Sequence, residues 1–174
     1  MAMSKYIIGA KFKNRQGSTF TLIRHEGGPF CTVRFESGYE TVAKTQNIVY
    51  GKVKDYLRPS VYGVGYIGSG MRIPTRESGD VVRKHYDLWA NMLKRTTQEK
   101  GYEDVTVHPA WHNFTTFNSE ITALEGYSDW LLDSAGYHLD KDLSGSRTYS
   151  KSTCRFIPAP ENLSDASNRR WGNK

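Results

Sequence analysis

Residues 137–170 read YHLDKDLSGSRTYSKSTCRFIPAPENLSDASNRR, and this stretch decides the fold of the C-terminal half. The alternation of side chains over residues 138–143 predicts a strand, and Ser144-Gly145-Ser146 supplies the small residues that a turn requires. A second strand is expected near residues 154–157. Pro158-Ala159-Pro160 then predicts the entry to a helix, because proline suits the first helical position. The expected order is therefore strand, turn, strand and helix.

Two amphipathic helices are expected before this stretch. Asp80 is placed to cap a helix whose apolar residues recur every three or four positions from Val81 to Leu93. A second helix is expected to open at His108-Pro109. One side of it carries an apolar stripe, which we interpret as core rather than as a platform for stacking bases: Trp111, Phe114, Phe117, Ile121 and Leu124.

Short alternating runs indicate β-structure in the N-terminal part of the chain. Glycine, asparagine and proline between the runs supply the backbone angles that hairpin turns require. Five strands are expected, at residues 6–8, 20–23, 31–35, 39–42 and 48–50. The sequence therefore predicts an α+β protein in three parts: a small basic antiparallel β module over residues 1–62, a glycine-rich linker over 63–80, and a helical region with a C-terminal ββα finger over 81–174.

The distribution of charge points to an acidic partner. The 174-residue chain has 24 basic and 18 acidic side chains and a net charge of +6. Residues 1–80 contain twelve basic and six acidic side chains, so the basic excess is N-terminal. Clustered Lys and Arg bind phosphate backbones by releasing counterions, so double-stranded DNA is the first candidate partner. The alternative is an ordinary solvated surface on a mildly basic protein.

Composition argues against several other classes. No window approaches the roughly 18 consecutive apolar residues that a membrane-spanning helix needs, so no membrane partner is expected. The N-terminal apolar run is only a few residues long, so we expect no secretory signal peptide. Cys31 and Cys154 lack any CxxC pattern, which argues against a disulfide scaffold and a cysteine-rich zinc site. His108 and His112 have the spacing of two ligands on one helical face, but no third ligand accompanies them.

The C-terminal stretch resembles the HNH family of endonucleases, whose ββα-metal finger has the same order of strand, turn, strand and helix. It is more similar to the phage-encoded members, in which a tryptophan-rich helical pair precedes the finger, here LWANMLKR and VHPAWHNFTTF; the likeness covers about residues 81–170. In this family the first strand carries a metal ligand followed directly by a His that acts as general base, and the helix carries a second ligand, often after a Glu. Asp140 matches the first ligand and Glu161-Asn162 match the helix pair. The resemblance implies that Asp140 and Asn162 hold Mg²⁺ or Mn²⁺, which suit carboxylate and amide oxygens.

The chain departs from the family at two positions. Lys141 stands where the family has its base His, and Ser152-Thr153-Cys154 stands where a central Asn is expected. A lysine is protonated at neutral pH, so Lys141 is expected to clamp a phosphate rather than to act as a base. His138 lies two residues before Asp140, on the same face of a regular strand, and is the nearby alternative base. The plainer interpretation treats Asp140 as a surface carboxylate and Asn162 as a residue that satisfies backbone groups at a helix start.

Three hypotheses follow, of which the first is a phage-type, homing-like endonuclease that hydrolyses DNA with a divalent metal ion in the cytoplasm of an infected bacterial host. The second is a DNA-binding protein that keeps the finger as a scaffold and has lost cleavage. The third is a phage protein-interaction module whose β part binds a host protein through exposed aromatic side chains. The candidate DNA contacts are Lys11, Lys13, Arg15, Arg34, Lys52, Lys54, Arg147, Lys151, Arg155, Arg169 and Arg170.

Overall fold

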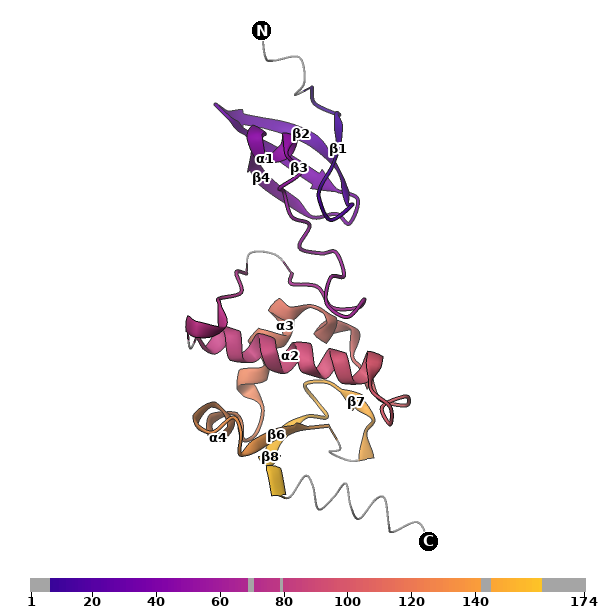
Figure 1. Ribbon diagram of the computed structural model, residues 1–174, viewed down its shortest axis with the longest axis vertical. Helices are drawn as coiled ribbons and strands as arrows, with labels where there is room; N and C mark the ends of the chain where they lie inside the picture. Colours follow the sequence, from indigo (N-terminus) through magenta and orange to yellow (C-terminus); the bar gives the residue numbers. More distant parts are fainter. Residues whose placement is uncertain (1–6, 69–70, 79, 142–144, 161–174) are drawn as a thin grey trace. The chain divides into compact units, whose positions relative to one another are not determined.

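The computed structural model describes residues 7–68, 71–78, 80–141 and 145–160. Contacts divide the chain into two compact units, an N-terminal unit of residues 1–59 with 66–69 and a C-terminal unit of residues 60–65 with 70–174. The N-terminal unit contains an antiparallel sheet, and the C-terminal unit combines helices with short strands (Figure 1). The expected α+β class is therefore confirmed.

Four antiparallel strands in sequence order form the sheet of the N-terminal unit. They are β1 (Lys11–Lys13), β2 (Thr19–Gly27), β3 (Phe30–Phe35) and β4 (Glu40–Lys44). Alternation along β2 and β3 turns one face inward, where Phe20, Leu22, Val33 and Phe35 are buried in a single core cluster. Gly38, at φ +87°, makes the turn between β3 and β4, a conformation that glycine adopts without strain.

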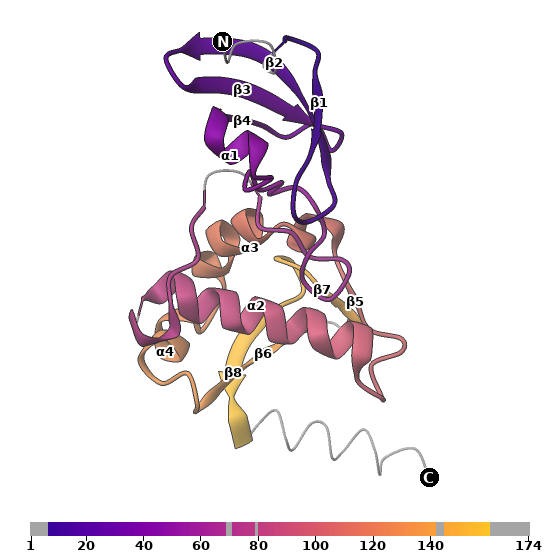
Figure 2. The same cartoon turned by 45° about the horizontal axis from the view of Figure 1, so that its top comes forward.

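Two of the five expected strands are wrong. The first strand was expected at residues 6–8, but the described residues 7 and 8 are not in a strand. The first strand of the sheet lies instead at Lys11–Lys13. Residues 48–50, expected as a strand, instead lie at the end of the short helix α1 (Thr45–Val49) (Figure 2). A strand would put residues 48 and 50 on one face, but Ile48 is 1% exposed while Tyr50 is 54% exposed. Only Ile48 of this segment packs into the core, and one turn of helix is enough to bury it.

Helix α2 (Val81–Gln98) is the longest described element of the C-terminal unit. Its expected cap is confirmed, because the Asp80 carboxylate accepts a hydrogen bond from the backbone N–H of Val82 at 2.7 Å. The side of α2 that faces the core carries His85, Trp89, Met92 and Leu93. The shorter helical segments are η1 (Arg76–Ser78), η2 (Pro109–His112), α3 (Phe114–Glu120), η3 (Ile121–Ala123) and α4 (Tyr127–Leu132).

The second expected helix is broken into η2, α3 and η3, so its continuity was wrong. Asn113 leaves the helical conformation, and its side-chain oxygen caps α3 by accepting a hydrogen bond from Thr115 N at 2.9 Å. The interpretation of its apolar stripe as core is confirmed, since the five side chains are 0–8% exposed: Trp111, Phe114, Phe117, Ile121 and Leu124. The spacing of these residues therefore predicted their burial correctly, but it did not predict a continuous helix.

Two pairs of short strands complete the C-terminal unit. β5 (Thr106–Val107) runs parallel to β7 (Thr148–Tyr149), and β6 (Tyr137–Asp140) runs antiparallel to β8 (Arg155–Pro158). β6 and β8 are the two strands expected near residues 138–143 and 154–157. The helix expected after Pro158-Ala159-Pro160 falls mostly on residues 161–174, which lie outside the described residues.

Part of the glycine-rich segment is packed rather than free. Residues 60–65 belong to the C-terminal unit, where Val61 and Gly65 form an antiparallel bridge. A Cβ atom at Gly65 would lie 2.4 Å from Leu93 Cδ1 and 2.8 Å from the Trp89 ring. The glycine is therefore required for the close approach of this backbone to α2.

His85 is a buried polar residue at the centre of the C-terminal unit, 3% exposed. Its Nδ1 lies 2.8 Å from Asn118 Oδ1 and its Nε2 lies 2.9 Å from the hydroxyl of Tyr127. A neutral ring satisfies both contacts, donating from Nδ1 and accepting at Nε2. Burial lowers the pKa of His85, so the folded protein keeps this ring neutral at neutral pH.

The buried ring of His85 is expected to make the protein less stable in mild acid. An unfolded histidine protonates near pH 6.5 and the folded one only below that, so the unfolded state binds more protons as the pH falls. The free energy of unfolding should therefore decrease below about pH 6.5, with a slope of at most about 1.4 kcal/mol per pH unit from this group. Urea unfolding between pH 5 and pH 8 measures the slope. His85→Gln, which cannot protonate, should lower stability overall but flatten the slope, and an unchanged slope would contradict the assignment.

Candidate active site and nucleic-acid interface

Strand β6 carries His138 and Asp140, two of the three residues that the sequence places at the proposed site, and Lys141 directly follows the strand. His138 lies opposite Ile157 of β8, and Asp140 lies opposite Arg155. His138 and Asp140 are two residues apart and therefore share one face of the strand pair, as expected. Asp140 is only 8% exposed, so the interpretation of this residue as a turn-flanking surface carboxylate is wrong.

The surroundings of Asp140 include the thiol of Cys154. Burial, together with the negative charge of Asp140, raises the pKa of Cys154 to about 12. The thiol therefore stays protonated at neutral pH and is a poor metal ligand and nucleophile. On the same face as Asp140, Arg155 is half-buried, and its Nε finds no hydrogen-bond partner among the described residues.

The side chain of Tyr149 in β7 lies close both to Lys141, the residue after β6, and to helix α2. The ammonium group of Lys141 lies 5.8 Å from the centre of the Tyr149 ring, which is within the range of a cation–π contact. Arg95, near the end of α2, lies close to Tyr149, and its positive charge opposes the effect of burial on the pKa of that phenol. Burial raises the pKa of Tyr149, so its hydroxyl remains protonated. Two cations, Arg95 and Lys141, thus lie close to one phenol.

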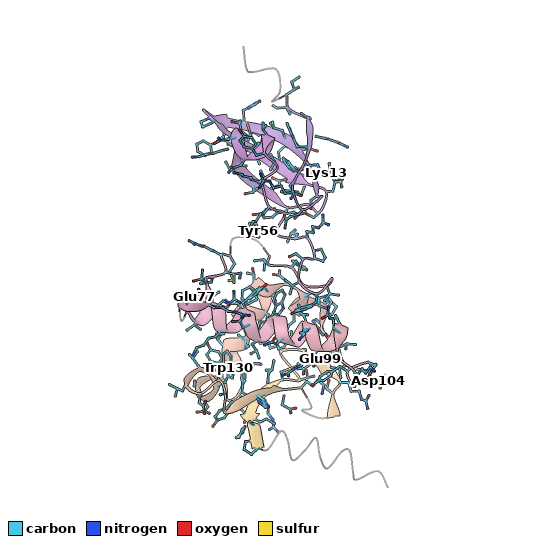
Figure 3. All side chains as sticks on the ribbon, viewed as in Figure 1. Lys13, Tyr56, Glu77, Glu99, Asp104 and Trp130 are labelled. Atoms are coloured by element: carbon cyan, nitrogen blue, oxygen red, sulfur yellow. The ribbon has the colours of Figure 1, made fainter. Side chains whose placement is uncertain are left out.

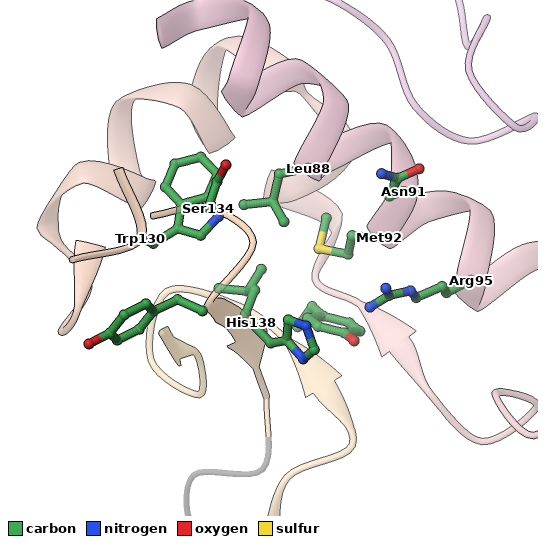
Figure 4. A pocket seen from close by; sticks show the side chains of 10 residues that line it. Leu88, Asn91, Met92, Arg95, Trp130, Ser134 and His138 are labelled. Atoms are coloured by element: carbon green, nitrogen blue, oxygen red, sulfur yellow. The ribbon is translucent and has the colours of Figure 1, made fainter. Parts of the chain in front are cut away.

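A cavity of about 160 Å³ opens between α2 and β6, and we call it the α2–β6 cavity (Figure 4). Its polar lining comes from Asn91, Arg95, Ser134, His138 and Tyr149. Sequence analysis singled out only His138 among these. Arg95 stands on the polar side of an amphipathic helix beside other basic residues, and nothing local distinguishes it from Lys94. Its role depends on contact with a residue more than fifty positions away.

The fit of the site to a divalent metal rests on Asp140. A buried carboxylate is a suitable ligand for Mg²⁺ or Mn²⁺, and Mg²⁺ is often held by one or two carboxylates together with substrate phosphates. Asn162, the expected second ligand, and its neighbour Glu161 lie outside the described residues. Within the described ranges, no group of three or more His, Cys, Asp and Glu side chains could hold a metal ion by itself. Such a cation would need Asn162 and the substrate.

The histidine pair before α3 has a structural explanation. His108 caps η2, since its Nδ1 accepts a hydrogen bond from the backbone N–H of Ala110 at 3.3 Å. A cap of this kind satisfies a free backbone donor at the start of a helical segment. This role accounts for His108 without a metal, in line with the weak zinc signal of the sequence.

The basic residues expected around the finger lie in different settings. Arg147 forms an ion pair with Asp104, with Nη1 and Oδ2 2.7 Å apart, and both side chains are exposed. Lys151 is exposed. Arg155 is half-buried opposite Asp140 and is therefore less available to DNA than the sequence suggests. Arg169 and Arg170 lie outside the described residues.

One face of the N-terminal sheet gathers basic side chains, and we call it the outer face. The register aligns Lys11 with Thr21, and Thr21 with Arg34, across three neighbouring strands. Lys13, labelled in Figure 3, lies two residues from Lys11 in β1, so the two share a face opposite to that of the partly buried Phe12. Arg34 is held by an ion pair with Glu40, Nε to Oε1 2.5 Å.

The remaining N-terminal candidates lie at the edge of the sheet and at a turn. Lys52 and Lys54 line a groove of about 390 Å³ along the edge strand β4, together with Lys44. Arg15 is tied to the turn after α1, because its Nε donates a hydrogen bond to the Tyr50 carbonyl at 3.2 Å. The six expected contacts of this unit are therefore spread over an outer face, a groove and a turn.

No family model matches the chain, and comparisons with curated proteins and with solved structures give no significant match either. In the part of the chain that the structure describes, no helix combines the length and the apolar character needed to cross a membrane. The functional argument therefore depends on the geometry of the two units.

Proposed function

We propose that the protein binds DNA and that its C-terminal unit is a metal-dependent endonuclease of the HNH type, active in a phage-infected bacterial cytoplasm. The observation that supports this most is the buried carboxylate of Asp140 at the end of a strand pair, with His138 on the same face and Lys141 next to it. A carboxylate can hold a divalent metal ion, a histidine can act as a general base and a lysine can supply positive charge, and metal-assisted phosphodiester hydrolysis uses functions of these kinds.

Each residue has a separate role in the proposed reaction. Asp140, with Asn162, would hold Mg²⁺ or Mn²⁺, and the cation would stabilise the charge that develops on the phosphate and the leaving oxygen. His138 would take the proton from the attacking water. Lys141, kept in position against the Tyr149 ring, would contribute positive charge beside the phosphate.

The N-terminal unit is proposed to hold the DNA. Lys11, Lys13 and Arg34 on the outer face form a basic surface on a small sheet, and β-sheets are known to bind DNA grooves through such faces. Contacts of this kind go mainly to phosphates, so they set affinity and position rather than sequence preference.

A second candidate function is DNA binding without cleavage. What favours it is the contact of Lys141 with the Tyr149 ring, which keeps a cation at the position where the HNH family has its base. Under this alternative the strand pair is a scaffold, and the basic outer face carries the whole activity.

A supercoiled-plasmid assay with Mg²⁺, Mn²⁺ and EDTA in parallel separates the two functions. The proposed endonuclease should produce nicked or linear DNA with at least one of the metals and none in EDTA. A protein that binds DNA but leaves the plasmid intact with every metal would contradict the nuclease and support the second candidate.

Binding through the outer face should show in the dependence of affinity on salt. Replacing Lys11 and Lys13 by Ala is expected to lower affinity and to reduce the slope of log affinity against log salt by up to about two, since each lost phosphate contact removes about 0.9. Lys94→Ala with Lys100→Ala is the charge-matched control in the other unit and should change the slope less. Fluorescence anisotropy with a DNA duplex measures both. Absence of any salt-sensitive binding in the unaltered chain would instead favour the protein-interaction hypothesis.

A further inference from the structure

The α2–β6 cavity combines a cation with several neutral hydrogen-bonding groups. Arg95 and Asn91 come from α2, His138 from β6 and Tyr149 from β7, and the sticks of Figure 4 show Arg95 and His138 directed toward the same space. No Asp or Glu lines the cavity. Asp133, beside the lining residue Ser134, accepts a hydrogen bond from Gly136 N at 3.0 Å, and Asp140 follows the lining residue Leu139 along β6 without lining the cavity itself. The cavity is therefore suited to an anion.

The apolar lining of the α2–β6 cavity strengthens its preference for an anion. Leu88, Met92, Trp130 and Leu139 form the apolar part of the lining. Trp130 and Leu139 are less than 9% exposed, so one side of the cavity is a dry protein interior. Electrostatic attraction is stronger where water is excluded, so a guanidinium at the rim of such a cavity attracts an anion more than the same group on an open surface.

The geometry of the donors matches a phosphate. The guanidinium of Arg is a planar fork that binds phosphate oxygens in pairs, and in Arg95 this group lies close to the Tyr149 phenol. Asn91 offers an amide on the same side of α2, one helical turn before Arg95. The cavity volume of about 160 Å³ is more than the space that one water molecule needs, and it leaves room for a phosphate group.

We propose that the α2–β6 cavity binds one phosphate group of a nucleic-acid strand, with Arg95 as its principal ligand and Tyr149 as the residue that positions Arg95. The choice of a strand phosphate rests on the proposed nuclease function, because His138 lines the cavity and shares a face with Asp140. Helix α2 then contributes directly to substrate binding, and the phosphate in the cavity holds the strand beside β6.

Histidine side-chain NMR of the full chain tests the cavity without any need for cleavage. The signal of His138 is assigned by its absence in His138→Gln, and His25 of the N-terminal unit is the internal reference. Inorganic phosphate, thymidine 5′-monophosphate and the dinucleotide TpT are titrated separately in EDTA. Each is expected to shift the His138 signal to saturation while leaving that of His25 unchanged. Absence of a saturable shift with all three probes would overturn the proposal, and saturation with inorganic phosphate but not with TpT would overturn the assignment to a strand phosphate.

Variants of α2 and β7 test the named residues. Arg95→Ala should weaken phosphate binding about tenfold or more, since it removes charge-assisted hydrogen bonds, and Arg95→Lys should recover part of the loss. Tyr149→Phe should have an intermediate effect. Lys94→Ala removes a charge at the neighbouring position and should change the affinity less than twofold. Equal losses for Arg95→Ala and Lys94→Ala would overturn the role of Arg95.

The same variants separate this proposal from that of the nuclease. Saturable phosphate binding that depends on Arg95, in a protein that never cleaves DNA, would support the cavity and refute the nuclease. Metal-dependent cleavage with full activity in Arg95→Ala would support the nuclease and refute the cavity. If both proposals hold, Arg95→Ala should raise KM more than it lowers kcat.

Discussion

Asp140→Asn is expected to reduce metal-dependent nicking of supercoiled DNA by at least about 100-fold. The change removes the negative charge that would hold the cation while keeping the size of the side chain and most of its hydrogen-bonding capacity, so the strand pair should remain folded. DNA binding in EDTA should stay the same or tighten slightly, because Asp140 contributes no phosphate contact and its charge repels the backbone. The nicking rate and the affinity in EDTA, measured on the same preparation, give the two values.

Asp129→Asn is the matched control for this variant. Asp129 is an exposed carboxylate on α4 in the same unit, and its loss should leave both nicking and binding unchanged. If Asp140→Asn and Asp129→Asn lose the same activity, the loss comes from the change in net charge and not from removal of a metal ligand. Lys141→His adds a second test: if it creates nicking in a protein that is otherwise inert with every divalent metal, the chain is a degenerate finger with an intact scaffold.

Gly126→Ala is expected to destabilise the C-terminal unit by about 2–5 kcal/mol. Gly126 precedes α4 at φ +73°, and a Cβ atom there would lie 2.4 Å from the carbonyl oxygen of Phe156. The left-handed conformation alone costs a non-glycine residue about 1–2 kcal/mol, and the clash with the backbone of β8 adds an overpacking cost of about 1–3 kcal/mol. The next strand contact, from Phe156 N to Glu125 O at 2.9 Å, would also lengthen.

Gly101→Ala measures the conformational cost alone, so the difference between the two variants gives the steric part of the effect. Gly101 has a similar φ of +88°, but nothing lies within 4 Å of a Cβ atom at that position. Urea unfolding of both variants should therefore show a loss of only about 1–2 kcal/mol for Gly101→Ala and a larger loss for Gly126→Ala. If the two losses agree within about 0.5 kcal/mol, β8 must shift easily to make room for the added Cβ atom. The start of α4 would then not hold the β6–β8 strand pair in position.

The elements that the sequence predicted best are those with strong local signals. The cap of α2 at Asp80, the spacing of its apolar residues and the two strands of the finger follow from the preferences of neighbouring residues. The same local rules failed at Asn113, where a capping side chain interrupts a helical pattern, and at Ile48, where one buried side chain in a short apolar run was taken for a strand. Short apolar runs are ambiguous because burial alone does not specify the backbone.

The sequence by itself determined that the three proposed site residues, His138, Asp140 and Lys141, lie within four positions of each other, and that His138 and Asp140 share one face of β6. Only the tertiary structure decided what surrounds them. Arg95 reaches Tyr149 from a different element, and Asp140 becomes buried against Cys154, through packing of segments that are far apart in the chain. Periodicity and caps describe contacts within a few residues, whereas these contacts depend on how helix α2 and the strand pairs share one core, and that arrangement has no local signature.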